Sequence, residues 1–415
     1  MNHQSFNQDS KNKSCCSYPR SCRLLKSFIG WVIIIFIVSL TRLSIAENIT
    51  VSVSGNTRTK SAYIENIVRD YLYRAGIETA TEIDIEKLTA LILDKELFSE
   101  VIVTVSDETV HITVKDRWTL IPIPLITSQS DQDTKYGLFV IERNFLGYGK
   151  TAIVGGMFSE SQSAYFLAYQ DPEIALTNWT LDAQTAKEDK VTYRYENEDK
   201  IFGDERTTYW NYFKVGYSFS EKFIAAVKVE SLDITFDDLD EYEQPDDYRT
   251  AASGLIIEYD AADFRFYYKE GWQARLEMAY QFYRDDNVEK VGLIEGQVNS
   301  DINLIGKQVL QTQVRAGFLD NGDDRDLFRL GGSIGFRGIQ EQGVWVDRFA
   351  ALSIDYQIPV WSGDLGTWTV APFSDFGYLN YPQDTDAYDY YASIGIGTYL
   401  FLKDVALPGV GIRRL

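Results

Sequence analysis

The segment WQARLEMAYQF, residues 272–282, alternates between two kinds of side chain. Its even positions hold Trp, Ala, Leu, Met, Tyr and Phe, whereas its odd positions include Gln, Arg and Glu. Successive side chains of a β-strand point to opposite faces, so the pattern predicts a strand with one apolar and one polar face. Its length exceeds the ~5–6 residues usual in soluble sheets. It fits the ~9–11 residues with which a tilted strand crosses a bilayer.

The same alternation recurs from Trp118 to the last residue and predicts about fifteen strands. A soluble sandwich could alternate in the same way, but these strands are long, and short connections alternate with long polar ones at 188–206, 233–248, 320–346 and 380–389. Short turns at one end and long loops at the other are typical of outer-membrane barrels. Open sheet edges cannot face lipid, so we predict a mainly β fold, a transmembrane antiparallel β-barrel. The strands are expected at 119–128, 135–145, 149–158, 162–171, 178–187, 207–219, 222–233, 250–261, 271–284, 288–300, 307–319, 347–359, 367–379, 389–402 and 407–415.

The composition of the 415 residues excludes several classes of protein. Forty Lys and Arg stand against 61 Asp and Glu, a net charge of −21, which argues against a nucleic-acid partner because phosphate requires a basic surface. A mean hydropathy of −0.21 excludes a bundle of membrane helices but not a barrel, whose strands are only half apolar.

The first 46 residues differ from the rest of the chain. Basic residues precede an apolar run from Phe28 to Leu40, and Ser44 and Ala46 supply small residues for cleavage. The run is short for a spanning helix, which needs ~20 residues. We therefore predict a signal peptide over residues 1–46, with an uncleaved anchor as the alternative.

Few residue types suited to catalysis follow this segment. All three cysteines (Cys15, Cys16 and Cys22) lie within it, and His111 is the one histidine beyond it. We find neither a GxSxG nucleophile motif nor a GxxxxGK[ST] phosphate loop. The acidic run at 320–326 lacks the ligand spacing of an EF-hand and is interpreted as a solvated loop. We therefore predict no enzyme and no catalytic, cofactor-binding or metal-binding residues.

A small separate domain is predicted at residues 47–117. A strand at 48–54 precedes a helix at 60–75, which Gly76 ends. A second helix, capped by Thr81 or Asp84, precedes two strands at 101–105 and 110–114. The predicted order is β-α-α-β-β.

Several segments together resemble the BamA/TamA-type outer-membrane assembly factors of Gram-negative bacteria, which join POTRA (polypeptide-transport-associated) domains to a surface-antigen barrel. The order of elements in 47–117 resembles a POTRA domain. The barrel segments that carry the resemblance are GLFVIERNFLGYGK (137–150), YQDPEI (169–174), YDAADFRFYYKEGWQ (259–273), FRLGGSIGFRGIQEQG (328–343) and FSDFGYL (373–379).

The resemblance implies that loop 320–346 folds into the barrel lumen and that Arg337 pairs with Asp375 in a structural role. Alternation independently places Asp375 on the lumen face, opposite Phe376 and Tyr378. Without the resemblance, a solvated glycine loop and an unrelated lumen carboxylate would be the favoured interpretation of these residues. The implied loop motif is Gly335, Phe336, Arg337 and Gly338, and the implied strand motif is Phe373, Asp375 and Gly377.

The resemblance also implies a function. A periplasmic POTRA domain at 47–117 would receive unfolded outer-membrane or secreted polypeptides by strand addition, and the barrel at 118–415 would help to insert or translocate them. The implied partners are these polypeptides, the lipid bilayer and periplasmic accessory proteins, with no nucleic acid and no cofactor. The alternative is a structural or binding barrel without insertase activity. The family barrel has sixteen strands, one more than is predicted here, and Ile339 stands where the family usually has an aromatic residue.

Overall fold

The structure is a computed structural model of the chain. It describes residues 49–129, 132–160, 162–196, 199–237, 244, 246–285, 290–322, 326–332, 336–339, 342–382, 389–406 and 410–414. The predicted signal peptide at 1–46 and Gly335 of the predicted loop motif lie outside the described residues.

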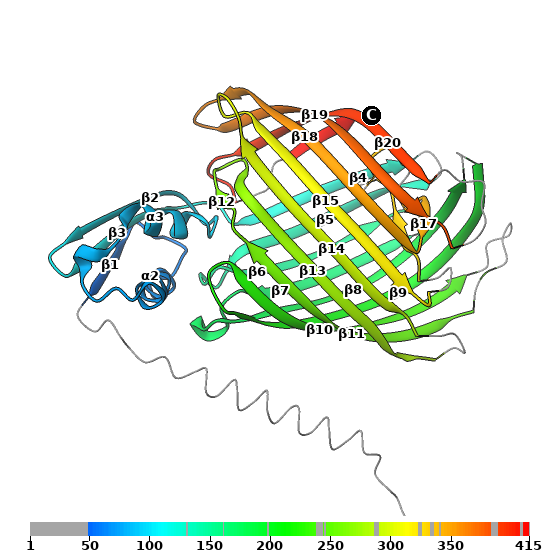
Figure 1. The fold of residues 1–415 in the computed structure, drawn as a ribbon, viewed down its shortest axis with the longest axis horizontal. Coiled ribbons are helices and arrows are strands. Elements are labelled where there is room, and N and C mark those ends of the chain that lie inside the picture. Colours follow the sequence, from blue (N-terminus) through cyan, green and yellow to red (C-terminus); the bar gives the residue numbers. More distant parts are fainter. Residues whose placement is uncertain are drawn as a thin grey trace, which may run out of the picture. The chain divides into compact units, whose positions relative to one another are not determined.

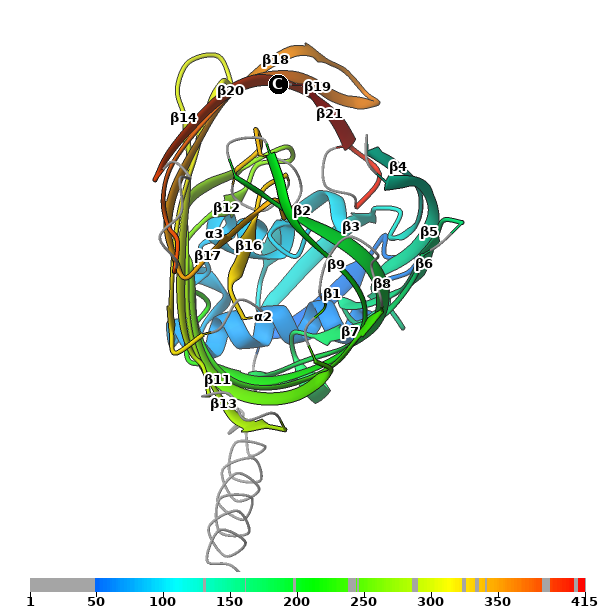
Figure 2. The ribbon, with the colours of Figure 1, turned by 90° about the vertical axis from the view of Figure 1, so that its right-hand side faces the viewer.

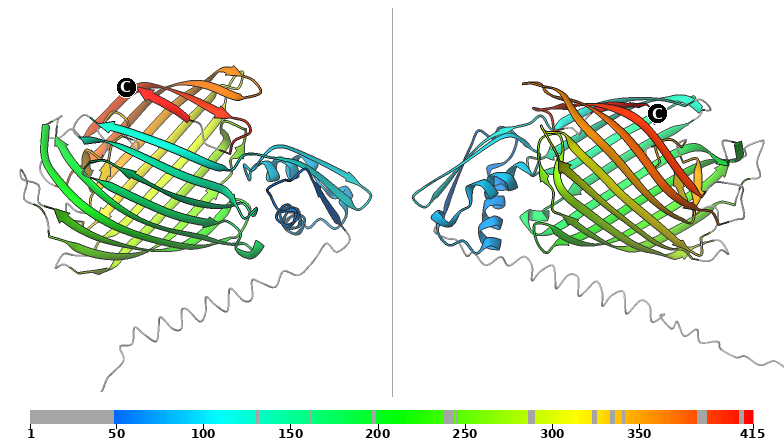
Figure 3. Two further views of the ribbon diagram at one scale, coloured as in Figure 1. Left: turned by 180° about the vertical axis from the view of Figure 1, so that it is seen from behind. Right: turned by 45° about the horizontal axis from the view of Figure 1, so that its top comes forward.

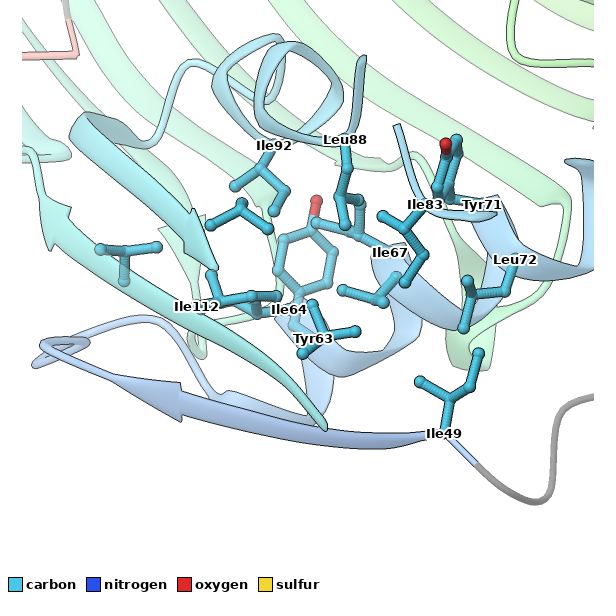
Figure 4. Packing of buried hydrophobic residues seen from close by; sticks show 14 of the residues in the cluster. Ile49, Tyr63, Ile64, Ile67, Tyr71, Leu72, Ile83, Leu88, Ile92 and Ile112 are labelled. Carbon is cyan, nitrogen blue, oxygen red and sulfur yellow. The ribbon is translucent and has the colours of Figure 1, made fainter. Parts of the chain in front are cut away.

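The N-terminal part of the described chain pairs two helices with a three-stranded sheet in the order β1-β3-β2, in which β1 runs parallel to β3. Tyr63, Ile64 and Leu72 of α2 are almost fully buried against Leu88 of α3 and Ile112 of β3 (Figure 4). This apolar cluster is the core that holds helices and sheet together. The elements are β1 (Thr50–Ser54), α2 (Ser61–Ala75), the 3-10 turn η1 (Ala80–Glu82), α3 (Ile85–Leu93), β2 (Phe98–Ser106) and β3 (Thr109–Asp116).

The ends of both helices follow from their capping residues. Gly76 adopts a left-handed φ of 66° and ends α2, a conformation that costs glycine little. Asp84 begins α3, because its side chain accepts a hydrogen bond of 3.0 Å from the backbone N–H of Lys87. Of the two caps that the sequence offers for this helix, the structure uses Asp84.

Apart from the short strands β16 and β17, the strands in the rest of the described chain form one sixteen-stranded antiparallel sheet that curves into a barrel (Figures 1 and 3). The predicted mainly β barrel is confirmed, and neighbours in sequence are neighbours in the sheet, except for the two-residue strand β12, which pairs only with β13. The strands are β4 (Leu120–Gln129), β5 (Gln132–Phe145), β6 (Lys150–Phe158), β7 (Ser163–Asp171), β8 (Trp179–Glu196), β9 (Asp199–Ser218), β10 (Phe223–Asp237), β11 (Tyr248–Asp260), β12 (Asp263–Phe264), β13 (Lys269–Arg284), β14 (Gly292–Asn303), β15 (Val309–Asp320), β18 (Arg348–Ser362), β19 (Gly366–Asn380), β20 (Tyr390–Leu402) and β21 (Val410–Arg414), with a 3-10 turn η2 (Ile174–Leu176) before β8.

The two faces of the sheet differ as the alternation requires. Trp272, Tyr280 and Phe282 of β13 are about half exposed on the outside. On the inner face, Arg275 and Glu277 of the same strand form an ion pair of 2.7 Å. An outer surface of large apolar and aromatic side chains suits lipid, and the charged inner face suits a wet lumen.

Two predicted loops are shorter in the structure than the sequence indicates. Within 188–206, predicted as a polar connection, residues 188–196 and 199–206 are strand: β8 and β9 stay paired from Glu188↔Thr208 to Glu196↔Asp199. Charged residues dominate this stretch, which is why it was predicted as a connection, but pairing through backbone hydrogen bonds does not require an apolar face. Likewise β10 extends to Asp237, into the predicted 233–248 loop.

Among the described residues, no helix combines the length and the apolar character needed to cross a bilayer.

Candidate functional site

The loop between β15 and β18 forms a short hairpin of β16 (Phe328–Leu330) and β17 (Val344–Val346). Figure 2 shows this hairpin inside the ring of strands. Leu330 and Val346 are buried together with Phe349 of β18 and Leu379 of β19. A patch of lumen wall that is apolar rather than charged therefore holds the hairpin in place.

Arg337, which lies in the loop between these two short strands, contacts a carboxylate on the barrel wall. Its Nε lies 3.1 and 3.0 Å from the two carboxylate oxygens of Asp375, and Nη2 lies 2.6 Å from Oδ1. The backbone N–H of Arg337 also donates to Asp375, at 3.1 Å. This two-pronged arrangement is the geometry in which a guanidinium binds a carboxylate most strongly. We call it the Arg337–Asp375 clasp.

Further groups complete the surroundings of the clasp. Nη1 of Arg337 donates to Asp355 of β18 at 2.8 Å, and the guanidinium carbon lies 3.8 Å from the ring centroid of Phe373. The hydroxyl of Ser393 on β20 donates to Asp375 at 3.2 Å. Three neighbouring strands thus contribute to holding one side chain of the loop.

The charge of Arg337 is strongly stabilised. Burial opposes the charged form, but hydrogen bonds and ion pairs with Asp375 and Asp355 outweigh it and raise the pKa of Arg337 above its usual value. The guanidinium is therefore a permanent cation at this site. A permanent cation cannot exchange protons, so it serves as an anchor rather than as an acid or base.

The remaining motif residues act through close packing. Phe336 is fully buried, and its ring lies edge-on to that of Tyr391, 5.5 Å between centroids. A Cβ at Gly377 would overlap the ring of Phe336, and a Cβ at Gly338 would overlap the hydroxyl of Tyr391. A side chain at either position would push against an aromatic side chain, so glycine suits the close approach of the loop to β19 and β20.

The structure brings together all the predicted site residues that it describes, namely Phe336, Arg337, Gly338, Phe373, Asp375 and Gly377. Asp375 is fully buried and Phe373 nearly so, as alternation along β19 requires. Ile339 packs at the edge of the same apolar cluster.

Sequence reasoning missed a second ionic anchor of the loop. Arg329 of β16 lies 3.1 Å from Asp204 of β9, and both side chains are buried. The guanidinium of Arg329 also stacks 3.9 Å from the ring centroid of Trp345. Burial and the nearby Arg206 lower the pKa of Arg329 to about 10, which leaves it charged at neutral pH. No local pattern in the sequence marks this pair, because its partners are 125 positions apart and are brought together only by the β8–β9 extension.

A third anchor lies on β13, where Arg284 meets Asp326 at 2.7 Å, again with both side chains buried. The backbone N–H of Tyr195 on β8 adds a 3.0 Å hydrogen bond to the carbonyl of Gly343. The loop is therefore attached to β8–β9, to β13 and to β18–β19. Within the described part of the chain, no three or more His, Cys, Asp or Glu side chains are arranged to hold a metal ion.

Ion pairs also join the N-terminal elements to a barrel strand and to a connection between strands. Lys95, after α3, pairs with Glu173 at 2.8 Å, and Arg58 pairs with Glu142 at 2.8 Å. Burial opposes the charge of Lys95, but its electrostatic interactions with Tyr63 and Glu173 outweigh burial and raise the pKa of Lys95. A Cβ at Gly149 would overlap the phenol of Tyr63, so this contact also needs a glycine.

No family model matches the sequence, and no curated protein matches it. Among solved structures, BamA from Haemophilus ducreyi lacking POTRA domains 1-3 is similar at a TM-score of 0.51 and 15% identity, with 88% of this chain and 80% of that chain covered. CdiB from Escherichia coli is similar at a TM-score of 0.60 and 12% identity, covering 86% and 70%. CdiB from Acinetobacter baumannii is similar at a TM-score of 0.52 and 10% identity, with 86% of this chain and 68% of that chain covered. At such identities the likeness establishes a common barrel fold.

Proposed function

We propose that this chain is an outer-membrane β-barrel protein that takes part, without enzymatic catalysis, in the insertion or translocation of other polypeptides. Its N-terminal domain would lie in the periplasm, behind a signal peptide at 1–46. The clients would be unfolded outer-membrane or secreted polypeptides. The likeness of its fold to BamA and CdiB supports this proposal.

The observation that carries the proposal is the Arg337–Asp375 clasp. A barrel that only lets small solutes diffuse needs an open lumen, whereas this one places its own loop inside and ties it by charge to the wall. The residues of the clasp lie in segments that resemble the assembly-factor family. The clasp therefore links the fold to the function of that family.

The N-terminal domain supplies a surface suited to extended polypeptide. Both β1 and β2 pair only with β3, so the described sheet has two edges with unpaired backbone groups. An extended client can satisfy such groups with little demand on its sequence. We infer that this domain, a POTRA domain by its order of elements, receives clients by strand addition.

A depletion experiment tests the proposal. Repressing the gene in its host and quantifying the outer-membrane and secreted proteins should show loss of particular barrels or of a secreted client, with recovery when the wild-type chain is restored. Unchanged membrane and secreted proteins in depleted cells would contradict the proposal. Fractionation of the same cells should place the protein in the outer membrane.

The second candidate is a structural or binding barrel without insertase activity. The observation that favours it is the set of three buried anchors, which fixes the loop to several walls of the barrel. For such a protein, depletion should weaken the envelope against detergent while the amounts of other membrane proteins remain the same. The same proteomic measurement therefore separates the two candidates.

A further inference from the structure

The first strand of the barrel lacks two of the hydrogen-bond donors that a strand edge ordinarily offers. β4 contains Pro122 and Pro124, and proline has no backbone N–H. The sheet ends at β4 on one side and, among the described residues, at β21 on the other. We call the gap between these two edges the seam.

The backbone hydrogen bonds around β4 show which way the two prolines face. The N–H of Arg143 on β5 donates to the carbonyl of Thr119 at 3.1 Å, so odd-numbered residues here point their backbone groups at β5. Backbone groups alternate sides along a strand, and the pairing of β4 with β5 shows no register shift before Thr127. Even-numbered residues, including both prolines, therefore point their backbone toward the seam.

The start of β4 confirms this direction independently. The N–H of Trp118 donates to the carbonyl of Asp404 at 2.7 Å, and its carbonyl accepts from Ala406 at 2.8 Å. The neighbouring Arg117 donates to the carbonyls of Leu402 and Lys403 at 3.3 and 3.1 Å. The seam is therefore joined at one point, just after β20, and the prolines follow directly beyond it.

A strand placed against β4 would meet an edge on which two backbone hydrogen-bond donors are missing. Opposite each proline, a carbonyl of the incoming strand would have no donor, and in lipid no water replaces the missing bond. Four residues from Leu120 to Ile126 face the seam. Leu120 and Ile126 carry a backbone N–H, whereas Pro122 and Pro124 do not. Proline on an exposed strand is a known means of preventing unwanted edge pairing.

We propose that Pro122 and Pro124 close the β4 side of the seam to client strands, so that client strand addition is confined to the opposite side. This inference rests on the proposed function and adds a direction to it. A client strand that adds to the sheet would therefore leave β4 unpaired, apart from its contact at Trp118.

Cysteine cross-linking in proteoliposomes tests the inference. The full chain, with Cys15, Cys16 and Cys22 replaced by serine, would carry a single cysteine as Leu120→Cys in β4 or Ile412→Cys in β21. The probe is a peptide of about ten residues that alternates valine and threonine and holds one cysteine. We expect roughly tenfold more disulfide at Ile412→Cys than at Leu120→Cys, the effect of one or two missing hydrogen bonds.

Restoring the donors should remove this difference. Pro122→Val together with Pro124→Val should raise capture at Leu120→Cys by roughly tenfold. The matched control replaces two prolines away from the seam, Pro359→Val in β18 and Pro372→Val in β19, and should leave capture at Leu120→Cys unchanged. Should the double seam variant fail to fold, as judged by heat-modifiable mobility, each single variant serves in its place with a smaller increase.

Equal capture at both positions in the wild-type chain would overturn the inference, and so would unchanged capture after the seam prolines are replaced. The inference and the proposed function can fail separately. Capture at β4 that appears only without the prolines supports the inference even if depletion leaves every client intact. A client lost on depletion but captured at β4 in the wild-type chain supports the function and overturns the direction.

Discussion

At the scale of single residues, the clasp shows which contacts local sequence can predict. Alternation along β19 is enough to turn Asp375 inward, because a strand has only two faces. The resemblance to a family supplied Arg337 as its partner. Neither indicated Asp355, which lies on β18 and is joined to Arg337 only by the register of the sheet. Strand faces are local properties, whereas partners across the lumen depend on the closed barrel.

Replacing Arg337 by alanine should release the loop without unfolding the barrel. The change leaves Asp375 buried without its counter-charge, which should lower the free energy of unfolding by about 3–5 kcal/mol in a urea titration. Arg337→Lys keeps the charge but loses the two-pronged guanidinium, so its free energy of unfolding should lie between those of the wild type and Arg337→Ala. The control, Arg275→Ala, removes a lumen arginine that pairs with Glu277 on the same strand and should leave the loop protected from protease. An unchanged midpoint in Arg337→Ala would show that the clasp contributes no stability.

Adding a methyl group at Gly377 should have a similar effect through packing. Gly377→Ala drives a Cβ into the ring of Phe336 and should cost about 1–3 kcal/mol, measured by the same titration. Gly296→Ala in β14 is the matched control, since its nearest atom would lie at an ordinary 3.9 Å. Phe336→Leu should recover part of the loss in Gly377→Ala. Equal stability of the two alanine variants would contradict the packing described here.

Asp116 should make the N-terminal domain sensitive to acid. Burial opposes its charge, but backbone N–H groups of Arg58 and Thr57 and the hydroxyl of Thr59 outweigh it and lower the pKa of Asp116. A carboxyl group whose pKa is lower in the folded state stabilises the fold at pH values above its unfolded pKa, about 3.9. This stabilisation is lost as the pH falls through the folded-state pKa.

Hydrogen exchange of α2 amides in the full chain, followed from pH 7 to 3, should therefore show protection falling below about pH 4. Asp116→Asn should start with lower protection and depend less on pH. Asp107→Asn, in the exposed turn between β2 and β3, is the control and should follow the wild-type curve. A curve for Asp116→Asn that matches the wild type would remove Asp116 from this account.

At the scale of elements, the structure departs most from the sequence prediction in the β8–β9 extension. The predicted strands reproduce the membrane part of the barrel because lipid imposes an apolar outer face. Residues 188–206 are dominated by charged side chains, so they were predicted as a loop although β8 and β9 stay paired up to Glu196 and Asp199. This extension holds Asp204, and with it the second anchor of the loop. The Arg329–Asp204 anchor was missed because the β8–β9 extension that carries Asp204 was predicted as a loop.

The pair of Arg329 and Asp204 should be strongly coupled. A double-mutant cycle with Arg329→Gln and Asp204→Asn should give a coupling energy of about 1–3 kcal/mol, because both groups are buried. The exposed pair of Arg249 and Asp233, at 2.8 Å, serves as control and should give less than about 1 kcal/mol. Coupling no larger than in the control would mean that the extension holds the loop by shape alone.

At the scale of the whole barrel, one loop connects strands that are distant in the sheet. Its anchors reach Asp204 on β9, Arg284 on β13 and Asp375 on β19, so the early and late halves of the barrel are tied through the lumen. The seam between β4 and β21 carries few hydrogen bonds of its own among the described residues. A barrel with a weakly joined seam needs such internal ties to keep its form.

The most direct measurement of the central claim is the folding of a urea-unfolded outer-membrane barrel in liposomes that contain the full chain. The account predicts that wild-type protein speeds client folding over protein-free liposomes and that Arg337→Ala, though folded, loses most of this gain, while Arg275→Ala keeps it. Folding no faster than in protein-free liposomes, or equal rates for wild type and Arg337→Ala, would contradict the account.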